Sequence, residues 1–474
     1  MPLEDTAEPL KDTAQTSAQR YRRLPTGAHG LDREAVARDQ RERLQAAMIE
    51  LIAKSGYPAL RIIDLTQLAH VSRPTFYTLF KDKEELMLSA YKDIALRTGE
   101  RVLLAYDVEG SQNERLRLAM LAFAKLAAAE PDAMSLFLFG AFGAGPTALE
   151  HRTQALEVFE QSVEASRDRT SVKPTTNLTV RVILGGIREV AASRLLEHRA
   201  HELPALAEEL STWAASYPAT LPARLPAVPP APGALGSSNG DARSATRARP
   251  SDRARRAEGP LPGGRHDLSR EFVIKSQRER IVDATAAIVA EKGLAALTIP
   301  EIASRAGVSH ETFYEMYSTK HAAFLGAQKV GMHQAFGIAV EAYELHKQTA
   351  WAYGIAEGLR ALISYLCSEP DHAHLSIVDT FAASPDTLQV RAETLRGFAH
   401  YFSPQERPAR DDVQVPGIAP EAVVGGAWQV LHYYIERGRL AELPAAAPQL
   451  IYLLLAPFLG PREAAKVARR PPAE

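Results

Sequence analysis

Apolar residues recur at helical spacing in two segments of this 474-residue chain, and the second segment repeats the first at an offset of 237 positions. In the first segment they lie at i, i+3, i+4, i+7 and i+8, namely Leu44, Ala47, Met48, Leu51 and Ile52, and the same pattern starts again at Ile281. That spacing places them on one face of an amphipathic helix. Neither half contains a run of alternating β-branched residues bounded by hairpin turns, so the pattern predicts an all-α protein.

Similarity between the two halves extends well beyond this helix. Residues 41–83 lie opposite residues 278–320 without a gap, and many positions are identical. Weaker similarity continues to Gly185-Gly186, which lie opposite Gly425-Gly426 at an offset of 240. A whole unit of the chain is therefore duplicated.

Two stretches lack a sustained helical period and separate or flank these units. Residues 1–37 are polar and mixed, and residues 218–268 are rich in Pro, Gly, Ser and Arg, which is typical of a linker. The sequence predicts a disordered N-terminal tail (1–37), a first head (38–92), a first helical body (93–217), a linker (218–268), a second head (269–329), a second helical body (330–460) and a C-terminal tail (461–474).

The composition limits which partners and sites the protein can have. Lys and Arg number 55 against 57 Asp and Glu, a formal net charge of −2, so any contact with nucleic acid must be local. The single cysteine, Cys367, excludes an intrachain disulfide framework and a Cys-rich zinc site. The apolar run 451–459 is shorter than the roughly 20 residues that a spanning helix needs, and the N-terminus shows no export signal. We therefore expect a cytoplasmic protein with no membrane partner.

Local signals in the second head outline a helix-turn-helix. Thr298 and Glu301 form a candidate capping box around a proline, which marks the start of a short helix. That helix ends at Gly307, and Ser309 can cap a second helix whose first turn is polar. Phe313 would face the core, and the N-terminal residues of the second helix would face a DNA groove.

These heads resemble the DNA-binding head of the TetR family of bacterial transcriptional regulators. The second copy matches the family motif at Thr298, Ile302, Ala303, Ala306, Gly307, Val308, Ser309, Thr312, Tyr314, Tyr317 and Lys320. The first copy matches it at Leu65, Ala69, Val71, Ser72, Thr75, Tyr77, Phe80 and Lys83. It departs at Arg61, where the family has a cap threonine, and at His70, where it has a turn glycine.

The resemblance implies that the heads bind a double-stranded DNA operator. It implies that phosphates are held by Tyr77, Lys83, Tyr314 and Lys320, and that the groove is faced by Arg73, Thr75, His310 and Thr312. The family's usual glycine after the cap is Pro74 in one copy and Glu311 in the other, so base preference stays open. Basic residues exceed acidic ones by two in 38–92 and equal them in 270–320. The alternative is therefore a ligand- or protein-binding module with one or both heads no longer binding DNA.

For the bodies, the resemblance implies that the last two helices pair with a partner and that the preceding region encloses a ligand pocket. The candidate seam residues are Ile183, Ile187, Val190, Leu195, Val424, Trp428, Leu431 and Tyr434, with purely intradomain core as the alternative. The second body also offers Trp351, Tyr353, Tyr365, His372, His374, His432 and Tyr433 in an apolar context. From these we select Trp351, Tyr353 and His432 as candidate ligand contacts; ordinary core or surface positions are the alternative.

Enzyme motifs are missing from the sequence. There is no phosphate-binding glycine loop, nucleophile elbow, paired-carboxylate motif or HExxH, so we predict no catalytic residue, no metal site and no cofactor. The resulting prediction is a ligand-responsive repressor that acts as a single-chain pseudo-dimer through intramolecular pairing of its repeats. A higher oligomer is the alternative to that pairing. The expected partners are the DNA operator and a small-molecule effector.

Overall fold

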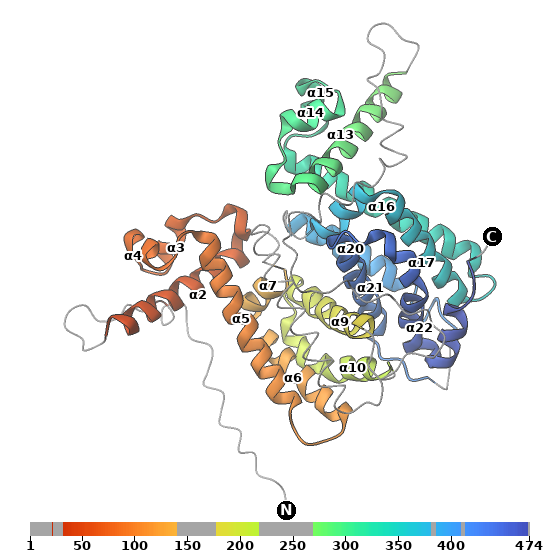
Figure 1. The fold of residues 1–474 in the computed structure, drawn as a ribbon, viewed down its shortest axis with the longest axis horizontal. Helices are drawn as coiled ribbons and strands as arrows, with labels where there is room; N and C mark the ends of the chain where they lie inside the picture. Colours follow the sequence, from red (N-terminus) through yellow and green to blue (C-terminus); the bar gives the residue numbers. More distant parts are fainter. Residues whose placement is uncertain are drawn as a thin grey trace, which may run out of the picture.

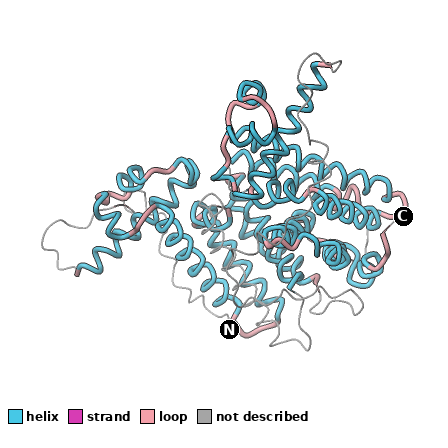
Figure 2. The backbone as a smooth tube through the Cα atoms, turned by 45° about the horizontal axis from the view of Figure 1, so that its top comes forward, coloured by secondary structure: helices cyan, strands magenta, loops and turns pink. Residues whose placement is uncertain are grey.

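The computed structural model describes Tyr21 and residues 32–139, 177–217, 269–380, 385–408 and 413–472, and every regular element in these ranges is a helix (Figure 2). The chain forms two units, and in each a small head stands away from a larger helical body (Figure 1). The two bodies lie against each other, while the heads project in different directions. The predicted all-α fold with two units is thus confirmed. The segment predicted as a linker lies outside the described residues.

The first unit begins earlier than the sequence suggested. Its helices are α2 (Arg33–Ala59), α3 (Ile62–Leu68), α4 (Arg73–Leu79), α5 (Lys83–Tyr106), α6 (Gln112–Ala129), α7 (Pro131–Leu138), α9 (Asn177–Leu196), η2 (Ala200–Glu202) and α10 (Leu203–Ala215). Helix α2 starts inside the predicted tail because the Asp32 side chain caps it, accepting a hydrogen bond from the Ala35 backbone N–H (2.6 Å). Helix α5 crosses residue 92 and is shared by the head and the body.

The second unit repeats this order. Its helices are α13 (Arg270–Lys292), η3 (Leu294–Ala296), α14 (Ile299–Ala306), α15 (His310–Met316), α16 (Lys320–His346), α17 (Trp351–Ser368), α18 (Pro370–Ala373), η4 (His374–Val378), α20 (Pro385–His400), α21 (Ala419–Glu436), η5 (Leu440–Glu442) and α22 (Leu443–Ala468). Element η4 is a π-helical turn, whereas the corresponding part of the first unit is α-helical in α7. Helix α22 continues past 460, where we predicted a tail, and Ala464 and Ala468 are buried.

Helix α22 belongs to the core of the second body. The segment Leu440–Ala468 is long and apolar enough to cross a membrane by length and composition, but 72 % of its most apolar window is buried inside the structure. It also contains four prolines, three of them beyond the first turn of the helix, and a glycine, Gly460, with φ of 74°, where the helix is kinked. This burial is what a core helix of a globular domain shows.

A buried arginine ties together the helices of each head. In the second head, Arg280 on α13 donates from Nε to the Ala306 carbonyl at the end of α14 (2.6 Å). In the first head, Arg43 on α2 donates from Nη1 to the Ala69 carbonyl (2.7 Å). The two arginines occupy equivalent positions in the repeat. Each therefore satisfies carbonyls that the end of a short helix leaves without partners.

The turn between the two short helices has the same backbone form in both heads. Gly307 lies in the left-handed region with φ of 60°, and a Cβ there would lie 2.6 Å from Nη2 of Arg280. His70 occupies the equivalent position of the first head with φ of 52°. The absence of a turn glycine in the first copy therefore does not change the turn, although a non-glycine residue pays a conformational cost there.

The two bodies meet where α9 of the first unit crosses α21 of the second, a contact we call the α9–α21 seam (Figure 1). A Cβ on Gly185 would lie 2.5 Å from Cβ of Gln429, and a Cβ on Gly425 would overlap Cβ of Glu189. Glycine is thus required on both helices for their backbones to approach this closely. A further contact joins the bodies at Tyr217, whose hydroxyl donates to the Leu453 carbonyl (3.0 Å).

Candidate functional site

The second helix of each helix-turn-helix is fixed at its start by a serine cap. The Ser72 hydroxyl accepts a hydrogen bond from the Thr75 N–H (3.1 Å), and the Ser309 hydroxyl accepts one from the Thr312 N–H (3.0 Å). Pro74 fits the first turn of α4, where no backbone donor is needed. Helices α4 and α15 therefore begin in the same way, with their N-terminal residues held in a defined direction.

Several predicted DNA contacts are exposed on these two helices. Arg73 and His310 are exposed at the first helical position of α4 and α15. Tyr77 and Tyr314 are 53 % and 56 % exposed, although each follows a fully buried phenylalanine that fills the head core. Solvent-exposed tyrosines beside a rigid core ring are well suited to hydrogen-bond a phosphate.

The predicted threonine contacts are less available. Thr75 and Thr312 are half-buried, and their hydroxyls lie 2.7 and 3.0 Å from the hydroxyls of the capping serines. A threonine hydroxyl carries a single proton but two acceptor sites. Both side chains can therefore accept a hydrogen bond from the amino group of a base while they remain part of the cap.

The two predicted lysines are engaged inside the heads. Nζ of Lys83 donates to the Leu60 carbonyl (3.0 Å), and Nζ of Lys320 donates to the Leu297 carbonyl (2.8 Å). Lys83 also lies over the Tyr57 ring, 4.5 Å from its centroid, and burial lowers the pKa of this lysine. Because an ammonium group has three donors, each lysine keeps N–H groups for a phosphate. Sequence reasoning missed this carbonyl contact, which has no signature in the motif.

The second head pairs several of its basic side chains with carboxylates. Arg305 on α14 forms an ion pair with Glu291 on α13 (2.7 Å), and Lys292 pairs with Glu301. Glu311 is exposed beside His310 on the first turn of α15. Acidic groups near the DNA-facing surface weaken the attraction to phosphates.

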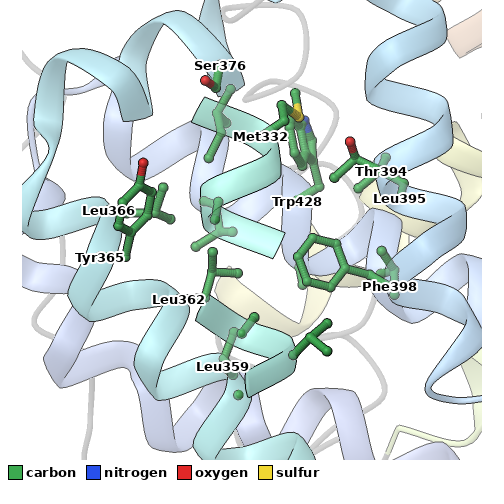
Figure 3. A pocket seen from close by; sticks show the side chains of 18 of the residues that line it. Met332, Leu359, Leu362, Tyr365, Leu366, Ser376, Thr394, Leu395, Phe398 and Trp428 are labelled. Atoms are coloured by element: carbon green, nitrogen blue, oxygen red, sulfur yellow. The ribbon is translucent and has the colours of Figure 1, made fainter. Parts of the chain in front are cut away.

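A cavity opens in the second body among α16, α17, α18, η4, α20, α21 and α22 (Figure 3). It holds about 970 Å³ of atom-free space, part of which is open to solvent. Most of its wall is apolar and includes Met332, Leu359, Leu362, Leu395 and Phe398. Apolar cavities with a few polar groups are typical of small-molecule sites.

None of the three ligand contacts predicted from the sequence lines this cavity. Trp351 donates from Nε1 to the Tyr401 carbonyl (2.7 Å) and packs on Phe402 and Phe458. Tyr353 lies beneath Arg470, and His432 is buried within α21.

Two other residues of the second-body set, Tyr365 and His372, do line the cavity. Trp428, which we predicted for the seam, lines it as well. The cavity wall is formed by the faces that several helices turn toward each other. The aromatic and histidine content of the sequence does not reveal which faces those are.

The protein has two capped helix-turn-helix heads on paired all-α bodies. This arrangement is typical of the class of helix-turn-helix DNA-binding regulators. The family model described as bacterial regulatory proteins, tetR family, matches residues 44–90 and residues 281–325, one match in each head. The chain therefore carries two DNA-binding heads of the TetR type in tandem.

Comparison with solved structures gives weak likenesses. One is to a TetR family transcription regulator from Marinobacter aquaeolei VT8, with 17 % identity and a TM-score of 0.31, covering 37 % of this chain and 94 % of that one. Another is to a TetR-like transcriptional regulator from Rhodococcus sp. RHA1, with 21 % identity and a TM-score of 0.29, covering 41 % of this chain and 100 % of that one. Comparison with curated proteins gives no match. The assignment rests on the two matches in the heads.

Proposed function

We propose that the protein is a cytoplasmic, ligand-responsive repressor that binds one operator as a single-chain pseudo-dimer. The observation that carries the proposal is the α9–α21 seam. Gly185 faces Gln429, and Gly425 faces Glu189. Each of these contacts maps onto the other when the repeat offset of 240 is applied. The two units therefore meet with the reciprocity that a two-fold homodimer interface has.

The charged residues at the seam favour pairing of a first unit with a second unit over pairing of two first units. Arg194 on α9 forms an ion pair with Glu421 on α21 (3.1 Å), and the repeat equivalent of Glu421 is Arg181. Pairing two first units would bring Arg194 toward an arginine instead of a glutamate. Like charges at such a position disfavour the wrong partner. The seam thus favours a first unit bound to a second unit.

A second, buried ion pair supports the same arrangement. Glu189 of the first unit bonds Arg391 of the second, with Oε1 3.2 Å from Nη1, and the two residues are 6 % and 5 % exposed. The repeat equivalent of Glu189 is Gln429, so pairing two second units would deprive the arginine of its carboxylate. Loss of one partner from a buried pair is strongly destabilising. Covalent connection of the units further raises their effective concentration.

The heads would read unlike half-sites. The first turn of α4 offers Arg73 and Thr75, while the first turn of α15 offers His310 and Thr312. Arginine can pair bidentately with guanine, and histidine presents a different donor and acceptor pattern. Phosphate contacts from Tyr77, Tyr314, Lys83 and Lys320 would fix the register of both heads. The operator is therefore asymmetric.

Ligand response would start from the cavity in the second body. Its wall includes His372, whose Nε2 lies 3.0 Å from Oδ1 of Asp283 on α13, the first helix of the second head. Leu375 of η4 is part of the apolar core of that head. A molecule that binds the cavity more tightly in one arrangement of α13 would shift the head toward that arrangement. In a repressor this shift releases the operator.

The ion pairs of the second head favour a second candidate, a regulator in which only the first head binds DNA. Arg305 and Lys292 are both paired with glutamates, and Glu311 lies in the first turn of α15. Matched variants separate the two candidates. If Tyr314→Phe weakens DNA binding as Tyr77→Phe does, both heads bind. If only Tyr77→Phe has an effect, the second head does not.

The experiment that tests the proposal is unbiased selection of bound sequences from random duplex DNA with the purified full chain. We expect one enriched site with two unlike halves about one helical turn apart. Failure to enrich any sequence would contradict DNA binding by this chain. A symmetric site would contradict reading by two unlike heads.

A further inference from the structure

Two polar atoms in the cavity of the second body have no hydrogen-bond partner within the described part of the chain. They are Nδ1 of His372 and Oγ of Ser376, and the two residues are only 4 % and 5 % exposed. Both residues line the cavity (Figure 3 shows Ser376). Burial of a polar atom without a hydrogen bond is unfavourable, and a ligand that forms the missing hydrogen bond offsets this cost.

Gly331 on α16 leaves space next to these atoms. A Cβ at this position would overlap Oγ of Ser376 and lie 3.6 Å from Nδ1 of His372. Both polar atoms therefore border the same small region of the wall, and Gly331 itself lines the cavity. A ligand atom can approach both from the cavity.

The hydrogen bond that His372 already makes determines which ligand groups can bind beside it. His372 Nε2 contacts a carboxylate oxygen of Asp283, which accepts hydrogen bonds, so Nε2 is the donor in that pair. In the neutral imidazole, Nδ1 is then an acceptor and requires a donor from the ligand. The Ser376 hydroxyl can donate in return. A ligand hydroxyl, which donates and accepts at once, satisfies both atoms.

The other polar groups of the wall are mostly engaged elsewhere. The Tyr365 hydroxyl bonds Gln334 (3.0 Å), the Tyr343 hydroxyl bonds Glu406 (3.0 Å), and the Thr394 hydroxyl donates to the Val390 carbonyl (2.9 Å). The indole N–H of Trp428 is a further donor without a partner in the described structure. Among the described residues that line the cavity there is no Asp, Glu, Lys or Arg. A charged ligand would therefore be buried there without an opposite charge.

We propose that this cavity binds an uncharged, largely apolar molecule through a hydroxyl group held by His372 and Ser376. The proposal rests on the ligand response proposed above and gives it a ligand class. The apolar part of the molecule lies against side chains such as Leu359, Leu362 and Phe398 (Figure 3). Its hydroxyl donates to Nδ1 of His372 and accepts from the Ser376 hydroxyl.

The first unit lacks this polar pair, which makes the site particular to the second unit. The repeat places large or apolar residues opposite every member of the set: Ile94 opposite Gly331, Ala133 opposite His372, Phe137 opposite Ser376 and Ala46 opposite Asp283. Ile94 and Ala133 are buried, and the Phe137 ring packs on Tyr91 with 5.6 Å between centroids. We therefore expect one such site in each chain.

The test compares two uncharged probes of equal heavy-atom count, 1-octanol and heptyl methyl ether, by calorimetry on the full chain. The ether can accept a hydrogen bond but cannot donate one to His372. We expect the alcohol to bind roughly three- to tenfold more tightly, as the loss of one buried hydrogen bond implies. Ser376→Ala should weaken the binding of both probes, because the oxygen of each probe accepts a hydrogen bond from this hydroxyl.

Thr394→Val is the matched control, because it also removes a hydroxyl from the cavity wall. That hydroxyl already donates to the Val390 carbonyl, so both probes should bind as tightly as they bind the unsubstituted protein. Gly331→Ile, which introduces the residue of the first unit, should abolish binding of both probes. Equal binding of both probes to the unsubstituted protein, or no binding of either, would overturn the proposal, as would binding of both probes that Ser376→Ala leaves unchanged.

Measurement of DNA affinity with each probe separates this inference from the proposed ligand response. A preference for the alcohol without any change in operator affinity would support the hydroxyl site and overturn the response to this ligand class. An equal change in operator affinity with both probes would support the response and overturn the hydroxyl site.

Discussion

Removal of the buried glutamate from the seam should expose how strongly the two units are joined. Glu189 and Arg391 are 6 % and 5 % exposed, and the guanidinium also lies over the Trp428 ring, 5.1 Å from its centroid. Glu189→Ala would leave this guanidinium in the seam without its carboxylate. Breaking a buried pair in this way costs about 3–5 kcal/mol. Glu189→Gln keeps the shape and one acceptor, so we expect a smaller loss of about 1–3 kcal/mol.

A double variant separates the charge effect from the packing effect. Replacing Glu189 by Leu and Arg391 by Met removes both charges and retains most of the buried volume. Such exchanges of a buried pair are often neutral or stabilising. We therefore expect the free energy of unfolding to return to within about 1 kcal/mol of the unsubstituted value, far from the sum of the two single losses.

The assay is urea denaturation followed by tryptophan fluorescence, because Trp428 lies beside Arg391 and reports on the seam. A broad or two-step transition would mean that the seam opens before the bodies unfold. The free energies of the variants are then compared for the first step of that transition. A loss below about 1 kcal/mol for Glu189→Ala, as expected of an exposed pair, would refute the buried seam. So would additive losses in the double variant.

Four further outcomes follow from the heads. Tyr77→Phe should weaken binding to all DNA sequences about equally, by roughly fivefold for one phosphate hydrogen bond, in gel-shift titrations. Lys320→Gln should lower the slope of log K against log salt by about 1 if this lysine holds a phosphate. Arg73→Ala should relax base preference in one half of the operator only, by about 1–3 kcal/mol in competition assays. Gly307→Ala should destabilise the protein by about 1–3 kcal/mol in thermal melts, because Cβ would meet Arg280, whereas His70→Gly should change stability by less than about 1 kcal/mol.

The local fold of the heads could be predicted from the sequence because short-range rules determine it. Ser72 and Ser309 cap the helices that their positions indicated, and Gly307 takes the left-handed turn. His70 shows where such rules stop, since it adopts the same turn without being glycine. The packing of the whole head holds His70 in a left-handed conformation that a non-glycine residue disfavours on its own.

The wall of the cavity could not be predicted in the same way. Trp351 and His432 looked suitable by type, but the packing of α17 and α21 turns them away from the cavity. The polar pair that borders the cavity, His372 and Ser376, depends on the space beside Gly331, a helical glycine with no local signature. Long-range packing of several helices decides which side chains share a wall. No local pattern carries that information.

The central claim is that one chain places both heads on one operator. The most direct measurement is the mass of the complex between the full chain and its selected operator, obtained by light scattering at low micromolar concentration. We expect one chain for each operator, with protection of two unlike half-sites in a footprint of the same complex. Two chains bound to a palindromic operator would contradict it.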